Sequence, residues 1–496
     1  MERDSGHTTA HLTYVTDRRL SELCTHLGKD AARLFWEGGA TAIEQIATLV
    51  QRTGADCDFR WVDGYLHAPL DATADADRVR ERERERERDQ LCKEAEFARE
   101  LGLDAEFLER TGPMSRPAVR FARQAKFHPR KYLQALLAAI PGNGSHVFTH
   151  SEVAEIEEIN KIEDAPLAVR ANGHRVGCSY LVLATHNPLM GRKGMMSAAL
   201  FQTKLALYTS YVIAARVPTG WSAEALYWDT CDPYNYLRVD SGPDHDIAIY
   251  GGSDVKTGQE TEPAVPGRAF ATAVPGRAFV NSRRRGSDDS EYTSAHPSTA
   301  FEALEARFTR LCSGAPTLHR WLGQVIETDD GLPFIGENAP RQFIATGFAG
   351  NGYTLGTLAA MMARDRYLGR DNAWADLFRV DRKPFHGGIW RYVSENKDFP
   401  YHLVRDRLAQ ADAKDLDAVP NGMGMIVAHR GQKVVAYRAD SGELTLLSPV
   451  CTHMKCLVRW NAAARTWDCP CHGSRFEPSG AVLSGPAETA LQKVQE

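Results

Sequence analysis

The sequence predicts a large α/β (or α+β) domain followed by a small all-β domain. Strand-like and helix-like segments alternate over most of the chain, as in a helix at 129–140 and a strand at 343–345 that runs into a helix at 354–368. Beyond residue 420, three short β-type runs follow one another between residues 425 and 447. Four of the ten cysteines then crowd into residues 451 to 471, which marks this end of the chain as chemically specialised.

Changes in composition predict the domain boundaries. We assign residues 1–408 to the large domain, 409–420 to a polar, charged linker and 421–496 to the small β domain. Within the large domain, residues 261–298 contain two copies of the motif AVPGRAF and a stretch rich in arginine, serine and aspartate. Two copies do not make a solenoid, so we interpret this segment as a surface insertion.

Composition excludes several classes of protein. The 496 residues are 43% hydrophobic and 25% charged with a net charge of −5, which does not favour nucleic acid or an anionic membrane as partner. The alternating Arg/Glu run at 80–89 is neutral overall and is typical of a solvated helix face. No apolar run reaches the roughly 18 residues of a membrane span, and we expect a cytoplasmic protein whose partners are small molecules or redox proteins.

Two cysteine–histidine pairs predict a metal centre near the C-terminus. Cys451 and His453 are two residues apart, so an extended backbone points both side chains the same way, and Cys469 and His472 bracket a proline-containing turn. One thiolate and one imidazole from each loop match a Rieske-type [2Fe–2S] cluster, in which two cysteines bind one iron and two histidines the other. A Cys₂His₂ zinc site uses the same ligands and is the competing interpretation.

Two further cysteines favour the cluster. Cys456, Cys471 and the segment Cys-Pro-Cys-His-Gly-Ser at 469–474 resemble the Rieske proteins of cytochrome bc complexes and their relatives. The resemblance implies that Cys456 and Cys471 form a disulfide between the two cluster loops, and that the Ser474 hydroxyl donates a hydrogen bond to a cluster sulfur. A tyrosine is common two residues further on, where this chain has Phe476, and we expect the loss of that donor to lower the reduction potential.

Four segments of the large domain resemble the D-amino-acid-oxidase-like family of FAD enzymes, specifically its bacterial members that end in a Rieske domain. These segments are residues 5–13, 181–188, 331–336 and 345–356. Glycines in the last segment let the backbone approach a ligand, and the helix that follows directs its first N–H groups at it. The FAD-binding residues that the resemblance implies are Gly6, His7, Thr8, Thr9, Val153, Ala184, Thr185, Gly350, Asn351, Gly352 and Thr354.

One part of that family pattern is not found. Members begin with a strand–helix–strand unit that carries G-x-G-x-x-G, whereas this sequence opens on the segment that normally follows that unit. Without that turn the pyrophosphate lacks a helix N-terminus and the ribose lacks its carboxylate. We therefore expect an N-terminally truncated flavin domain that binds FAD weakly or not at all.

The resemblance implies oxidation of a small substrate, an amine or amino acid, with electrons passing through the cluster to an external acceptor. The alternative is a Rieske electron-transfer or redox-sensing protein whose flavin domain does not turn over. A Rieske oxygenase would need a mononuclear iron site of two histidines and a carboxylate, which the sequence does not suggest. His128, Tyr250 and Tyr353 are conceivable pocket residues, but we interpret them as structural, and the catalytic acid–base residues stay unassigned.

Overall fold

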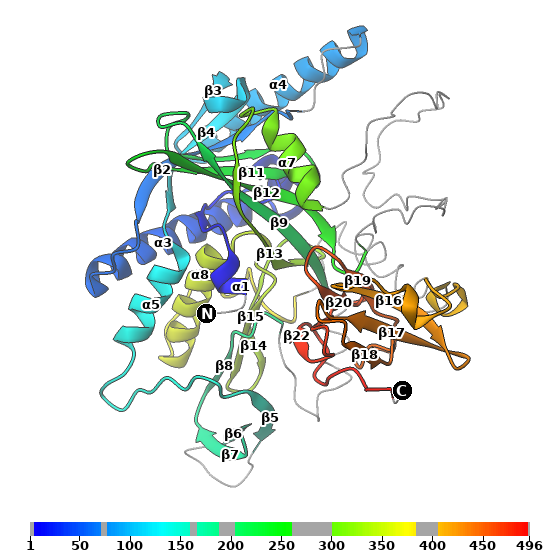
Figure 1. Ribbon diagram of the computed structural model, residues 1–496. Helices are drawn as coiled ribbons and strands as arrows, with labels where there is room; N and C mark the ends of the chain where they lie inside the picture. The colour runs from blue at the N-terminus through cyan, green and yellow to red at the C-terminus, as the bar shows by residue number, and fades with distance from the viewer. Residues whose placement is uncertain are drawn as a thin grey trace.

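The computed structural model describes residues 4–70, 77–158, 166–187, 204–259, 300–382 and 405–494. Figure 1 shows a mixed α/β body that carries the chain as far as α8, and a smaller β-rich body in orange and red formed by its last part. The predicted fold class, an α/β (or α+β) domain followed by a small β domain, is confirmed. The predicted insertion at 261–298 lies outside the described residues.

A nine-stranded sheet forms the centre of the large body. Its order is β1-β4-β2-β10-β11-β12-β9-β13, and β3 pairs with residues 116–121 of β4. All neighbouring strands are antiparallel except β2 and β10, which are parallel. The strands are β1 (His11–Leu12), β2 (Arg60–His67), β3 (Ala105–Thr111), β4 (Arg116–Lys126), β9 (Leu205–Val217), β10 (Leu226–Asp229), β11 (Asn235–Asp240), β12 (Asp246–Lys256) and β13 (Thr317–Thr328). Strand β9 is rich in β-branched and aromatic residues and is buried at every position except Arg216, because other elements cover both of its faces.

Helices surround this sheet. They are α1 (Asp4–His7), α2 (Leu20–Leu27), α3 (Lys29–Thr53), α4 (Asp77–Glu100), α5 (Pro129–Ala139), α7 (Ala300–Thr309) and α8 (Gly352–Tyr367), and a 3₁₀ turn lies at Gly112–Met114. Helix α3 buries an apolar stripe that includes Phe35, Trp36, Ile43 and Ile46. Gly39 on α3 allows the backbone of Tyr14 to lie against the helix, since a Cβ there would be 3.0 Å from the Tyr14 Cα.

A second, three-stranded sheet leads into α8. Its order is β14 (Phe334–Ala339), β15 (Gln342–Thr346) and β8 (Leu181–Leu183), and β8 runs parallel to β15. The chain turns directly from β15 through residues 347–351 into α8, as the glycine-rich sequence predicts. A separate antiparallel sheet comprises β5 (Val153–Glu158), β6 (Leu167–Ala171) and β7 (His174–Cys178).

The small body consists of two short antiparallel sheets. The first comprises β16 (Met423–His429), β17 (Gln432–Arg438) and β18 (Leu444–Leu447); the second comprises β19 (Arg459–Asn461), β20 (Thr466–Asp468), β21 (Arg475–Phe476) and β22 (Val482–Ser484). The segment predicted as a linker contains a 3₁₀ turn at Leu416–Ala418, and Asp412 N–H donates to the carbonyl of Ile426 at 2.7 Å. This segment therefore lies along β16.

Candidate functional site

The four predicted metal ligands lie on two loops of the small body. The loop after β18 carries Cys451 and His453, and the Cys451 N–H donates to the carbonyl of Cys456 at 2.8 Å. The loop after β20 carries Cys469 and His472, and the Cys469 N–H donates to the carbonyl of Ser474 at 2.8 Å. Each ligand pair is thus held in a loop that backbone hydrogen bonds close at its base.

The structure brings the side chains of these ligands together. Cys451 and Cys469 are buried, and the sulfur atoms of the pair hydrogen-bond each other. The imidazole rings of His453 and His472 lie with their centroids 5.0 Å apart and nearly perpendicular. The Nδ1 atom of His453 is buried and makes no hydrogen bond, which is the state of a nitrogen that can bind a metal.

Local hydrogen bonds and burial favour the ligand form at three of these four groups, whereas at Cys469 the hydrogen bond with Cys451 and burial raise the thiol pKa. The hydrogen bond with Cys469, together with N–H groups of His453 and Met454, lowers the pKa of Cys451 to about 7. Burial lowers the pKa of His453 to about 4, and burial together with His453 lowers that of His472 to about 3. Near neutral pH the site therefore offers neutral imidazoles and a thiol that readily ionises, as metal binding requires.

A disulfide joins the two loops. Cys456 and Cys471 are bonded to each other, while Cys451 and Cys469 remain thiols. The sulfurs of Cys456, Cys469 and Cys471 all lie within 4.8 Å of one another, but the disulfide leaves only Cys469 of these three as a ligand. The available donors are then two thiolates and two neutral imidazoles, a set that fits a [2Fe–2S] cluster with cysteines on one iron and histidines on the other.

Two buried side chains beside the ligands match the predicted differences in cluster tuning. Ser474 is fully buried; its hydroxyl donates to the Cys451 sulfur and its oxygen accepts from the Ala487 N–H at 3.1 Å. Phe476 is also fully buried and packs in the same apolar cluster as the ligand cysteines. Ser474 therefore supplies a hydroxyl donor at the site, whereas Phe476, two positions further on, supplies none.

Ser474→Ala is expected to lower the reduction potential of the cluster by about 40 mV. A hydrogen bond to sulfur stabilises the reduced, more negative cluster; it is worth about 1 kcal/mol, and for one electron about 59 mV corresponds to 1.4 kcal/mol. Redox titration followed by EPR measures the change. Ser479→Ala, at an exposed serine in the turn after β21, is the control and should leave the potential unchanged. An equal potential in all three proteins would contradict the assigned role of Ser474.

A buried polar network supports the strand that leads to Cys469. Asp468 accepts hydrogen bonds from Thr466 Oγ1 at 2.8 Å, Asn461 Nδ2 at 3.1 Å and Arg475 Nε at 3.3 Å. The Asp468 side chain is 1% exposed and that of Arg475 is 9% exposed. The network connects β19, β20 and β21 next to the second cluster loop, which begins at the residue after Asp468.

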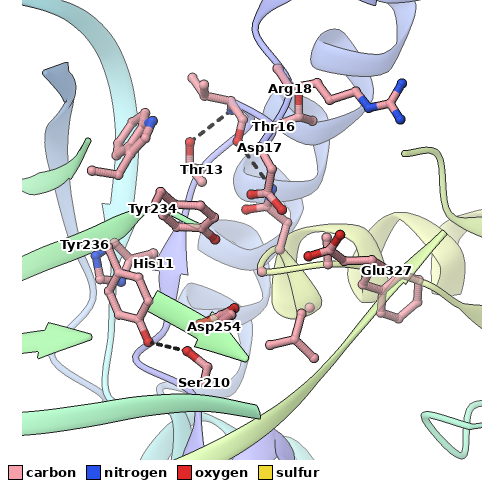
Figure 2. A pocket seen from close by; sticks show the side chains of 18 of the residues that line it. His11, Thr13, Thr16, Asp17, Arg18, Ser210, Tyr234, Tyr236, Asp254 and Glu327 are labelled. Atoms are coloured by element: carbon pink, nitrogen blue, oxygen red, sulfur yellow. Dashed lines mark hydrogen bonds between the residues drawn. The ribbon is translucent and has the colours of Figure 1, made fainter. Parts of the chain in front are cut away.

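The large body contains a cavity of about 1620 Å³. Its walls come from the segment around β1, the end of β8, the residues that precede β11, strand β13 and the turn before α8. Figure 2 shows Tyr234, Tyr236 and Ser210 on one side and Asp17 and Glu327 facing them. At this size the cavity exceeds the range of about 300–1,000 Å³ usual for small-molecule sites.

The N-terminus of α8 opens onto this cavity. Gly350, Asn351 and Gly352 line it, and no side chain caps the first turn of the helix. The hydroxyl of Thr354 in that turn is buried and makes no hydrogen bond. N–H groups at a helix start that no side chain caps fit the electron-rich pyrimidine edge of a flavin, so the residues that line the cavity here suit the flavin end of FAD.

The structure brings most of the predicted FAD residues to this cavity. Those that line it are His7, Thr8, Thr9, Ala184, Gly350, Asn351 and Gly352. Gly6, Val153, Thr185 and Thr354 are not among its lining residues: Gly6 lies in α1, Val153 begins β5 in the separate sheet, Thr185 donates its hydroxyl to the Asn187 carbonyl, and Thr354 is buried in α8. All eleven FAD assignments stay predictions.

The three conceivable pocket residues have different surroundings. Tyr353 lines the cavity and donates its hydroxyl to the carbonyl of Ser5 at 2.9 Å, and burial raises its pKa. His128 accepts from the Lys131 N–H at the start of α5, and Tyr250 packs against Phe308 in an apolar core. Neither His128 nor Tyr250 is a lining residue, in keeping with the structural roles expected for them.

Sequence reasoning missed most of the polar wall of the cavity. Tyr236 hydrogen-bonds Ser210 through its hydroxyl at 3.3 Å, and the His11 ring contacts it edge-on. Burial, followed by the carboxylates of Asp17 and Asp254, raises the pKa of Tyr234. The spacing of Tyr234 and Tyr236 could have indicated this wall, because residues two apart on an extended segment share one face.

Two family models match the chain, and together they define the class of protein as a flavoprotein domain fused to a Rieske domain. The model of the FAD dependent oxidoreductases matches residues 2–366, and the model of the Rieske [2Fe-2S] domain matches residues 409–495. The chain therefore belongs to the family of FAD dependent oxidoreductases and carries a Rieske domain at its C-terminal end. FAD and a [2Fe–2S] cluster are the cofactors of these two domains, which decides against zinc at the cysteine–histidine site.

Individual relatives agree with both assignments. The protein YhfW of Bacillus subtilis, named for a Rieske 2Fe-2S iron–sulfur centre, is 28% identical over 495 residues, which cover 99% of this chain and 86% of that protein. The iron–sulfur subunit of the cytochrome b6-f complex of Chlorobaculum tepidum is 40% identical over 90 residues, or 18% of this chain and 48% of that subunit. The second match is restricted to the cluster domain.

Solved structures show the fold of the large body. Glycine oxidase from Geobacillus kaustophilus matches with a TM-score of 0.54 and 16% identity, covering 77% of this chain and 89% of that one. Glycine oxidase from Bacillus cereus matches with a TM-score of 0.50 and 14% identity, and it also covers 77% of this chain and 89% of that one.

Among the described residues, no helix is both long and apolar enough to cross a membrane.

Proposed function

We propose that this protein oxidises a small amine or amino acid at the cavity of the large domain and delivers the electrons through the Rieske cluster to an external one-electron acceptor. The observation that carries the proposal is the position of the second cluster loop, which lies against strand β13, itself a wall of the cavity. A cluster placed beside a substrate cavity is positioned to accept electrons from it.

The polar wall of the cavity supports a cationic substrate. Asp17, Asp254 and Glu327 all lie close enough to Tyr234 to raise its pKa, and they line the cavity with it. Carboxylates and the faces of tyrosine rings both attract ammonium groups. The two glycine oxidases that share the fold act, by name, on a small amino acid, which supports the same class of substrate.

The side chains of this protein would bind and orient the substrate, while FAD, when bound, supplies the hydride acceptor. Tyr234 and Tyr236 have raised pKa values because they are buried, so their hydroxyls remain protonated near neutral pH and act as hydrogen-bond donors. The first N–H groups of α8 lie on the opposite side of the cavity, where the flavin would bind. A bound ammonium group has to lose a proton before hydride transfer, and no described group is assigned as the base that accepts it.

The experiment that tests this function combines cofactor content with turnover. The purified full chain is analysed for iron, zinc and flavin, and then assayed for reduction of a one-electron dye in the presence of a panel of amines and amino acids. We expect two irons per chain, bound FAD, and dye reduction that depends on one class of amine. Iron without flavin and without turnover would instead support the electron-transfer or redox-sensing function.

A further inference from the structure

We infer that Gln324 is a positioning residue that holds the second cluster loop against the wall of the substrate cavity, so that the cluster is reduced within its own chain. The inference rests on the proposed function and adds to it the route that the electrons take. It assigns a role to a contact between a residue that the first family model covers and a loop that the second covers.

The Gln324 side chain connects the large body to the ligand loop. It lies on β13, is 4% exposed, and its Nε2 donates to the carbonyl of Gly473 at 2.8 Å. Its Oε1 accepts from the Ser484 hydroxyl at 2.9 Å. Gly473 stands directly between the ligand His472 and Ser474, and Gln324 also lines the cavity. A single residue thus contacts the cavity on one side and the cluster loop on the other.

A second amide repeats this arrangement on the same loop. Gln259, which follows β12, donates its Nε2 to the carbonyl of Pro470 at 3.0 Å, and Pro470 follows the ligand Cys469. Farther from the cluster, Asn461 donates to the Tyr211 hydroxyl at 3.2 Å. Carbonyls on both halves of the ligand loop are therefore held by glutamine side chains of the large body, and burial makes the loss of either donor costly.

The two backbones also approach each other more closely than side chains would allow. A Cβ at Gly258 would lie 2.6 Å from the carbonyl carbon of Cys469, and a Cβ at Gly473 would lie 2.5 Å from Cβ of Leu207. Glycine at both positions lets the loop lie directly on the ends of β9 and β12. The shape of the interface and its hydrogen bonds favour the same docked arrangement.

Docking has a direct consequence for electron transfer, because transfer through protein slows steeply with distance. With both cofactors bound, the cavity side would give up the two electrons of each substrate one at a time, and the cluster would accept each of them. An external one-electron acceptor, such as a haem protein, would take up the first electron before the second follows, and the two substrate-derived protons would pass to solvent. A loop held by Gln324 keeps the donor-to-cluster distance short in every turnover.

Two substitutions in the full-length holoprotein separate docking from cluster assembly. Gln324→Glu keeps the size of the side chain and the acceptor for Ser484, but removes the donor to Gly473. Gly258→Ala places a methyl group against the backbone of Cys469 and Pro470, so it pushes the loop away from the large body while leaving all four ligand side chains in the sequence. Gly220→Ala is the matched control, because Gly220 has nearly the same backbone conformation, φ +73° against +79°, but no atom within 4 Å of the added Cβ.

Hydrogen–deuterium exchange and flavin-driven cluster reduction are the measurements. In Gln324→Glu we expect the amides of Cys469 and of residues 471–474 to exchange about tenfold faster, as the loss of one buried hydrogen bond implies, and in Gly258→Ala we expect a similar increase because the added methyl group displaces the loop. After photoreduction of the flavin, the EPR signal of the reduced cluster should appear about tenfold more slowly, since small displacements of reacting groups have large effects on rate. The dithionite-reduced signal should keep its full amplitude, and Gly220→Ala should match the wild type throughout.

The outcomes distinguish this inference from the proposed function. If both variants show the wild-type rates of loop amide exchange and of cluster reduction, the roles assigned to Gln324 and to docking are overturned, while the proposed function stays intact. If the reduced flavin of the wild-type protein never reduces the cluster, the proposed function fails and the inference fails with it. Faster loop exchange together with slower cluster reduction supports both.

Discussion

Cys469→Ser is expected to abolish the [2Fe–2S] cluster and with it most of the stability of the small domain. The Cys469 sulfur is 2% exposed and hydrogen-bonds the Cys451 sulfur, so its loss removes a ligand from the centre of the site. Serine is a poor iron ligand and would leave a hydroxyl in an apolar cluster. The EPR signal after dithionite reduction should disappear, and the iron content should fall to background.

The control for this prediction is Cys57→Ser. Cys57 is 1% exposed, so it matches Cys469 in burial, but it packs in the core of the large domain. This variant should keep its iron and its EPR signal even if its thermal midpoint falls. A Cys469→Ser protein with unchanged iron content, or a wild-type protein that contains zinc without iron, would contradict the assignment of the site.

Asp468→Ala is expected to destabilise the small domain by about 3 to 5 kcal/mol, the cost typical of breaking a buried ion pair. The substitution removes the acceptor of three hydrogen bonds and leaves the Arg475 guanidinium in a buried position without its carboxylate. Urea unfolding, followed by the visible circular dichroism of the cluster, measures the free energy of unfolding of this domain.

Asp440→Ala is the matched control for this second prediction. Asp440 also pairs with an arginine, Arg465, at 3.0 Å, but the two side chains are 72% and 46% exposed. Exposed ion pairs contribute about 0 to 1 kcal/mol, so the unfolding curve should barely move. A similar small effect in both variants would mean that the network around Asp468 does not stabilise the strands that carry Cys469.

Local patterns explain why the cluster site could be predicted in detail. All four ligands and both disulfide cysteines fall between residues 451 and 472, and each loop is closed by hydrogen bonds between residues five apart. Spacing within one loop determines which side chains point together, so no long-range packing has to be known. The helix after the glycine-rich turn was predictable for the same reason, and it begins at Gly352, two residues before the predicted position.

The cavity was predictable only at the positions where the family pattern is local. The turn at Gly350 to Gly352 and the segment at His7 to Thr9 reach it, whereas Val153 begins a separate sheet. The polar wall of Tyr234, Asp254 and Glu327 was missed because these residues come from three separate stretches of the chain. No spacing rule relates residues that meet only through the pairing of strands.

The sequence by itself determined the two families and the presence of a large domain before a small β domain, because each depends on motifs or composition within a short stretch. The four cluster ligands that it indicates stay predictions. Only the tertiary structure decided that the ligand loop lies on the cavity wall. The hydrogen bond from Gln324 to Gly473 joins residues 149 positions apart, and the close approach of Gly258 to Cys469 depends on the packing of two independent sheets. Contacts of this kind follow from the complementary shapes of folded surfaces, which local sequence does not encode.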